Sequence, residues 1–142
     1  AIEEARSGNQ FNAPHKAALG VIIDGLIDLK LCTGSRNEIE EKESYKDFFM
    51  HRTSHWLGLD VHDAGDYVDS DGKSIKLIDG NVLTIEPGCY IKPSSKIPKE
   101  FWGIGVRIED DILINNNNPI VLTEKAPKEI SDLELLVGSK ND

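Results

Sequence analysis

The sequence is poor in the features that mark several large classes of protein. Its two cysteines, Cys32 and Cys89, lack CxxC spacing, which argues against a disulfide framework and predicts free thiols in a reducing cytoplasm. Lys and Arg number 16 against 25 Asp and Glu, and the net charge of −9 argues against nucleic-acid binding, which needs a basic surface. No apolar run approaches the roughly 20 residues that cross a bilayer. No signal peptide opens the chain, so we expect a cytoplasmic protein without a membrane partner.

What the sequence does contain is sufficient for one folded domain. It has 142 residues, of which 39% are hydrophobic and 29% charged, and this composition is ordinary for a globular protein. A chain of this length can bury roughly 68–70% of its unfolded surface. Its first residue is Ala1 rather than Met, which indicates a processed, tagged or truncated start.

Apolar residues follow a helical spacing in the first part of the chain and form short strand-like runs from about residue 47 onward. Together these patterns predict an α+β fold. Three helices are predicted from apolar spacing and capping residues: Asn12–Leu29, Asn37–Tyr45 and Pro127–Leu136. Six strands are predicted from short apolar runs between Gly, Pro and Asn: Phe48–His51, Leu57–His62, Asn81–Ile85, Cys89–Ile91, Gly105–Glu109 and Asp111–Ile114. We expect the long first helix to pack on an antiparallel sheet that carries the polar residues.

The most informative segment is the histidine-containing run 54–63. His55 and His62 lie seven residues apart in an otherwise apolar stretch that includes Gly58. A buried imidazole needs a hydrogen-bond partner or a metal, although either histidine alone also fits a purely structural role. An odd spacing places the two rings on opposite faces of a regular strand. A bend or bulge near Gly58, or a change from loop to strand, is therefore required if both rings face one site.

Two glutamates stand in equally unusual surroundings downstream. Glu86 ends an alternating run in which it shares a face with Thr84, and Glu109 shares a face with Arg107. An arginine at that distance can hold a carboxylate ionised and aimed, whereas a glutamate before Pro-Gly also fits a simple turn. Imidazole and carboxylate ligands together suit Mn, Zn, Co or Fe, and an oxygen-rich set favours Mn. Such mixed sets are typical of two-metal hydrolases.

Three blocks of sequence, in this order, carry a resemblance to a known family. They are FFMH at 48–51 running into SHWLGLDVHD at 54–63, LTIEPG at 83–88 and GIGVRIEDD at 103–111. The chain resembles the metalloaminopeptidase superfamily of the "pita-bread" fold, and within it most resembles Xaa-Pro aminopeptidase (aminopeptidase P). The resemblance implies hydrolysis of the bond between an N-terminal residue and a following proline, with two Mn²⁺ ions and peptide substrates that carry proline at the second position.

The resemblance also implies metal-binding residues, matched motif by motif. His55, Glu86 and Glu109 are implied as metal ligands, with Glu109 bridging two ions and Glu86 also relaying protons as acid and base.

The same resemblance implies three further catalytic residues. His62 is expected to hydrogen-bond the substrate near the scissile carbonyl and stabilise developing negative charge. His51 is expected to line the substrate site and assist proton movement, and Arg107 to orient the carboxylates. Arg52 stands where the family usually has Gly, which predicts either a substrate pocket narrowed by a long cation or a displaced segment.

Two aspartate ligands that the family pattern places upstream of His55 have no counterpart here, because Asp24 and Asp28 lie inside the first predicted helix. The resemblance therefore implies that residues 1–142 are the C-terminal portion, about half, of a single catalytic domain. We expect this portion alone to bind at most one divalent ion weakly and to be inactive. It is also expected to expose sheet edge and apolar area, which allows self-association into homo-oligomers.

Two alternative functions remain open. An Xaa-Pro dipeptidase (prolidase) shares the downstream blocks almost completely, and only the sequence SHWLG at 54–58 favours the aminopeptidase. A non-enzymatic binding module of the same fold is the second alternative, and intact ligand positions argue against it.

Overall fold

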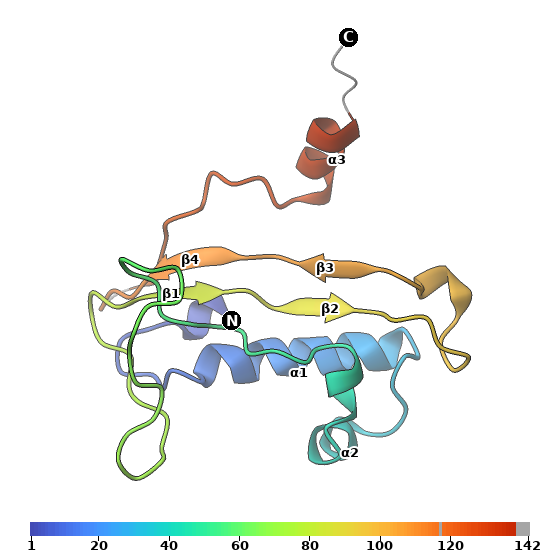
Figure 1. Ribbon diagram of the computed structural model, residues 1–142, viewed down its shortest axis with the longest axis horizontal. Coiled ribbons are helices and arrows are strands. Elements are labelled where there is room, and N and C mark those ends of the chain that lie inside the picture. Colours follow the sequence, from blue (N-terminus) through green and yellow to red (C-terminus); the bar gives the residue numbers. More distant parts are fainter. Residues whose placement is uncertain (117, 139–142) are drawn as a thin grey trace.

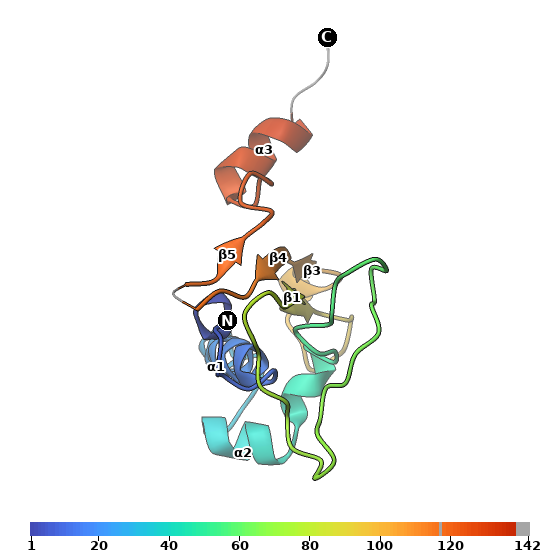
Figure 2. The ribbon, with the colours of Figure 1, turned by 90° about the vertical axis from the view of Figure 1, so that its left-hand side faces the viewer.

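The computed structural model, which describes residues 1–116 and 118–138, consists of one strand layer with helices on both sides. The helices and 3-10 turns are η1 (Ile2–Glu4), α1 (Ala13–Asp28), α2 (Arg36–Glu41), η2 (Ser44–Asp47), η3 (Lys99–Phe101) and α3 (Ile130–Gly138). The strands are β1 (Val82–Ile85), β2 (Gly88–Tyr90), β3 (Gly105–Arg107), β4 (Asp110–Leu113) and β5 (Ile120–Val121). Figures 1 and 2 show α1 and α2 on one side of the strands and α3 on the other, standing away from the body. No helix in the described ranges is both long and apolar enough to cross a membrane.

The strands form one long antiparallel ribbon with a break in its middle (Figure 1). β1 pairs with β4, which also pairs with β5, and β2 pairs with β3. Ile85 lies opposite Asp110 at the end of the first pair, and Gly88 lies opposite Arg107 at the start of the second. A single register therefore continues across the break, where residues 86–87 face residues 108–109.

Two clusters of buried side chains support this ribbon. The first joins α1 and α2 to the β2 end and contains Leu19, Ile23, Leu26, Leu31, Cys32, Ile39, Tyr45, Phe48, Phe49 and Ile91. The second lies at the β1–β4 end and contains Ala5, Phe11, Trp56, Leu77, Leu83, Ile85, Ile112 and Ile114. Phe49 belongs to one cluster and Trp56 to the other, so the segment between them is anchored at both ends.

The first predicted helix is confirmed, since Asn12 immediately precedes α1 and Pro14 lies in its first turn. The second helix begins two residues earlier than predicted and ends at Glu41 rather than Tyr45. Its capping box is made by Ser35 and Glu38 rather than by Asn37 and Glu40, since Ser35 Oγ accepts from Glu38 N while the Glu38 carboxylate accepts from Ser35 N. The last helix begins at residue 130 rather than 127, and the short strand β5 was not predicted.

Two of the six predicted strands, Phe48–His51 and Leu57–His62, are wrong. Residues 53–57 instead lie beside β1 and exchange backbone hydrogen bonds with it, including Glu86 N to Thr53 O at 2.8 Å and Thr84 N to His55 O at 3.0 Å. The chain then turns, because the Asp63 carboxylate accepts from the backbone N–H groups of residues 59 and 64. An apolar run thus becomes a turn because a side chain satisfies its backbone donors.

A buried ion pair fastens the segment that precedes α3 to β4. Asp110 is 5% exposed, and its Oδ1 accepts from Lys128 Nζ at 2.6 Å and from Thr123 Oγ1 at 2.7 Å. A buried carboxylate that loses its cation keeps its desolvation cost. The ion pair between Asp110 and Lys128 therefore stabilises the first residue of β4, directly after Glu109.

Replacing Lys128 with Ala is expected to lower the free energy of unfolding by about 1–3 kcal/mol, because Asp110 would keep only a neutral donor. Urea unfolding followed by circular dichroism measures the change. Lys125→Ala is the matched control, since Lys125 is exposed, and it should shift stability by less than about 0.5 kcal/mol. Equal effects of both substitutions would contradict the buried pair's role.

His15, in the first turn of α1, links this helix to the segment that carries the other histidines. Its Nδ1 lies 2.9 Å from Thr53 Oγ1, and its ring packs against Phe49. Burial lowers the pKa of His15 below its usual 6.5, and the nearby positive charge of Arg52 and the ring of His51 act in the same direction. The folded protein therefore binds this proton less readily than the unfolded chain does.

Stability is expected to fall as the pH drops through 6.5 toward the lower folded pKa of His15, because protonation there favours the unfolded chain. Above 6.5 this contribution is fully present. His15→Asn removes the titrating group, so the loss of stability between about pH 7.5 and about pH 5.5 should be smaller in the variant. Identical pH dependence of urea midpoints in the two proteins would refute the expectation.

Candidate metal centre

The break in the ribbon places two glutamates opposite each other. Glu86 follows β1 and Glu109 precedes β4, and the shared register on either side of the break makes them cross-strand partners. Two carboxylates in that position repel each other. The Glu86 side chain is only 12% exposed, so water screens it poorly, and a positive charge between the two carboxylates is the arrangement that relieves the repulsion.

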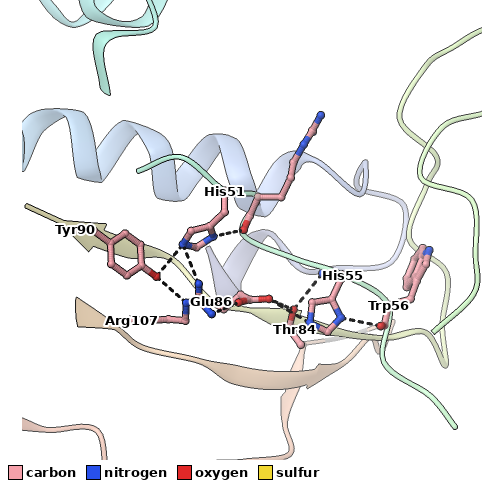
Figure 3. A network of polar contacts seen from close by, with 8 residues as sticks. His51, His55, Trp56, Thr84, Glu86, Tyr90 and Arg107 are labelled. Atoms are coloured by element: carbon pink, nitrogen blue, oxygen red, sulfur yellow. Dashed lines mark hydrogen bonds and ion pairs between the residues drawn. The ribbon is translucent and has the colours of Figure 1, made fainter. Parts of the chain in front are cut away.

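His55 completes this arrangement from the neighbouring segment (Figure 3). Its Nδ1 lies 2.9 Å from the carbonyl oxygen of Trp56. A carbonyl only accepts hydrogen bonds, so Nδ1 carries a proton and Nε2 is the ring nitrogen available to a metal ion. That Nε2 lies 3.2 Å from Glu86 Oε1. Two acceptors at this distance require a proton or a metal ion to bring them together.

The donor set is of the kind that binds a divalent metal. One ligand atom from each of His55, Glu86 and Glu109 lies within 4.8 Å of the others. The supporting contacts are those expected around metal ligands, because Thr84 Oγ1 accepts from His55 N at 3.1 Å and donates to Glu86 Oε1 at 3.1 Å. One imidazole and two carboxylates suit Mn, Fe, Co or Zn, so the residues present fit such an ion.

Arg107 connects the glutamate pair to a second histidine. Its Nη1 lies 3.3 Å from Glu86 Oε2, and its Nε donates to Tyr90 Oη at 2.8 Å. Tyr90 Oη in turn lies 3.0 Å from His51 Nε2. The hydrogen bond to Tyr90 raises the pKa of Arg107, and the negative charges of Glu86 and Glu109 raise it further. The guanidinium is therefore permanently charged where it meets the carboxylates.

His62 reaches the site because of the turn after residue 57. Its ring packs edge-on against that of His55, with centroids 4.2 Å apart. A Cβ at Gly58 would collide with the Asp63 carboxylate that holds this turn, so glycine is required there. The bend near Gly58 that the odd histidine spacing demanded is confirmed.

A cleft of 540 Å³ opens beside His55, and residues from distant parts of the chain line it. Arg52 is among them together with the aromatic rings of Phe11 and Tyr67. Ser54 also lines the cleft, and its Oγ is buried without a hydrogen-bond partner in the described part of the chain. The long cation next to His51 thus lies at the edge of this cleft.

All six residues singled out from the sequence lie in one region, but they play unequal parts in it. His55, Glu86 and Glu109 form the ligand cluster. Arg107 was expected to orient Glu109 on its own strand, and it forms an ion pair with Glu86 across the ribbon. The sequence reasoning did not identify Tyr90, although its position two residues after Gly88 on the face of Glu86 was a usable signal.

Comparison with known proteins gives concordant findings. The model of metallopeptidase family M24 matches residues 1–116. An Xaa-Pro aminopeptidase of Haemophilus influenzae is 39% identical over 138 residues, covering 97% of this chain and 32% of that protein. One of Escherichia coli K12 is 42% identical over 117 residues, covering 82% of this chain and 26% of that protein. The chain thus spans between a quarter and a third of the length of these two relatives.

Solved structures give the same result for the fold. The structure of Pseudomonas aeruginosa aminopeptidase PepP matches 96% of this chain and 31% of its own, with a TM-score of 0.91 at 41% identity. Zinc-substituted E. coli aminopeptidase P in complex with product matches 99% of this chain and 33% of its own, with a TM-score of 0.84 at 36% identity. The predicted α+β fold, with the architecture of part of a pita-bread domain, is confirmed.

The ligand cluster predicts that the chain binds Co²⁺ through His55, Glu86 and Glu109, with visible absorption bands that report the bound ion. Glu86→Gln should weaken binding at least about tenfold, because it removes a charged ligand that other groups hold in place. Glu124→Gln changes an exposed glutamate and is the control. Equal Co²⁺ affinities for the two variants would show that the ion binds elsewhere.

Proposed function

The chain belongs to metallopeptidase family M24. We propose that it supplies part of the active site of a dinuclear Xaa-Pro aminopeptidase. The observation that carries the proposal is the convergence of His55, Glu86 and Glu109 at the break in the ribbon. The relatives that it matches along most of its length bear the name Xaa-Pro aminopeptidase. Residues 1–142 would form the C-terminal portion of the catalytic domain.

The metals would be two Mn²⁺ ions, held by His55, Glu86 and Glu109, with Glu109 as the ligand that both ions share. An oxygen-rich ligand set favours Mn²⁺, and two such ions would supply the Lewis acidity and the activated water that peptide hydrolysis needs. Two further aspartate ligands would come from the first half of the domain. This chain by itself would hold at most one ion weakly and would be inactive, since three ligands leave the paired geometry incomplete.

The remaining residues would act on the substrate and its protons. Glu86, paired with Arg107 and close to His55, would relay the proton between the nucleophile and the departing amine. His62 is exposed beside His55, so it can reach a peptide carbonyl and stabilise its developing charge. His51 would line the substrate site and assist proton movement.

A cytoplasmic location is proposed because Cys32 and Cys89 are both free thiols. Self-association stays a prediction. It is motivated by exposed apolar side chains, of which Val106 and Ile108 flank Arg107 and are 51% and 47% exposed.

The runner-up function is an Xaa-Pro dipeptidase, which would use the same cluster on a shorter substrate. A non-enzymatic binding module is disfavoured by the supporting contacts of Thr84 and Arg107, because such contacts serve a metal ligand and have no evident value in a fold that binds no metal.

The protein that contains both halves of the domain is expected to release the N-terminal residue from Xaa-Pro-Xaa peptides in the presence of Mn²⁺. Glu86→Gln should lower kcat by at least about a thousandfold, because it removes a ligand and the proton relay together. Glu100→Gln alters an exposed glutamate in η3 and should leave kcat unchanged.

The same assay separates the alternatives. Cleavage confined to Xaa-Pro dipeptides would make the protein a prolidase. Absence of any Mn²⁺-dependent turnover with both halves present would favour the non-enzymatic binding module.

A further inference from the structure

A wide cleft at the β2 end of the molecule gathers positive charge in an otherwise acidic protein. It has a volume of 740 Å³ and lies between residues 31–33, which follow α1, the residues of η2 and its flanks, and the segment 92–97 after β2. A cleft lined by one sign of charge concentrates its electric field and attracts ligands of the opposite sign. We call it the lysine cleft, because four of the 16 Lys and Arg residues line it against one acidic residue, Asp47: Lys42, Lys46, Lys92 and Lys96.

The four lysines differ in what they contact. Lys42 and Lys46 each face a glutamate a few residues earlier in the chain, at 3.9 and 2.7 Å. Lys92 and Lys96 are exposed and form no ion pair with any residue that the structure describes. Each of their ammonium groups offers three hydrogen-bond donors. Hydroxyl groups stand between the charges and add neutral donors to the walls, those of Thr33, Ser44 and Ser94.

The lysine cleft adjoins a smaller hollow that contains His51. That hollow has a volume of 310 Å³ and shares Lys46 and Met50 with the lysine cleft. It also contains Arg52, which lines the cleft beside His55 as well. The three spaces therefore follow one another from the metal ligands to the lysine cleft, with a cation at each junction.

Cleavage after the first residue of a peptide determines which part of a substrate can occupy this path. One residue lies on the amino side of the scissile bond, whereas all the others lie on its carboxyl side. A path that leads away from the metal ligands past His51 therefore suits the leaving segment. An extended chain covers roughly 3.3 Å per residue, so the segment that fills the path consists of several residues.

We propose that the lysine cleft binds the part of the substrate that follows the proline, and that it selects peptides in which this part carries Asp or Glu. The inference rests on the proposed function and adds a substrate class to it. Complementary charge across an interface provides this kind of selectivity. Because the lysines are exposed, each contact contributes little, and the preference arises from several contacts together.

The first test compares three peptides in the protein that contains both halves of the domain. They are Ala-Pro-Gly-Glu-Glu and the same peptide with Gln or Lys in place of both Glu. The acidic peptide should have a KM about fivefold below that of the Gln peptide with nearly equal kcat, because the contacts lie away from the reacting bond. This advantage should shrink as salt rises from roughly 0.05 to 0.5 M. Equal KM values for the acidic and Gln peptides would overturn the proposal.

A double variant identifies the cleft as the source of the preference. Lys92→Gln with Lys96→Gln should remove most of the advantage of the acidic peptide and leave kcat/KM for the Gln peptide unchanged. Lys16→Gln with Lys125→Gln is the matched control, since both lysines are exposed and outside the three spaces, and the net charge changes equally. An equal loss in both double variants would mean that overall charge sets the preference, and would overturn the proposal.

Binding is measured separately in the 142-residue chain, without metal. The acidic peptide with an acetylated N-terminus should shift the backbone amide NMR signals of residues 42–46 and 92–96, and the Lys92/Lys96 double variant should abolish the shifts. Equal shifts with inorganic phosphate alone would indicate a small-anion site and overturn the assignment to a peptide. Turnover without acidic preference would refute this inference alone, whereas binding without any turnover would refute the aminopeptidase assignment.

Discussion

The arrangement of this molecule depends on two carboxylates that face each other across a sheet. Glu86 and Glu109 occupy the break between two strand pairs that share one register. Such a pair is unfavourable without a cation, and nothing about the apolar core requires it. Arg107 compensates part of the charge from one side. The other side is left to the atoms of His55 and to a metal ion that these three residues fit.

The rest of the fold holds this repulsive pair and its histidines in place. The segment between Phe49 and Trp56 is buried at both ends, in two separate clusters. Within it, His51 and His55 each donate from Nδ1 to the backbone carbonyl of the next residue. Both rings consequently turn their Nε2 atoms toward groups of the ribbon, Tyr90 for His51 and Glu86 for His55. Backbone contacts thus fix the orientation of two side chains before any ligand arrives.

The sequence predicted the parts of the fold whose determinants are local. The long first helix and four of the strands follow from apolar spacing and turn residues. The strand proposed for residues 57–62 was wrong although its determinant is also local: the Asp63 carboxylate accepts from the backbone N–H groups of residues 59 and 64, which outweighs the strand propensity of an apolar run. The capping box fell on Ser35 rather than Asn37, because both residues have a glutamate three positions later and this spacing alone does not distinguish them.

The sequence by itself determined which donor atoms exist and which of them share a strand face, since alternation along a strand is a property of the backbone. It did so for Thr84 with Glu86 and for Arg107 with Glu109, and family resemblance added the individual roles of His55, Glu86 and Glu109 as metal ligands. Tertiary structure alone decided that the two glutamates are cross-strand partners, because register depends on contacts between distant segments. The same holds for Tyr90, whose hydroxyl meets His51 only because two glycines from different strands leave room for its ring.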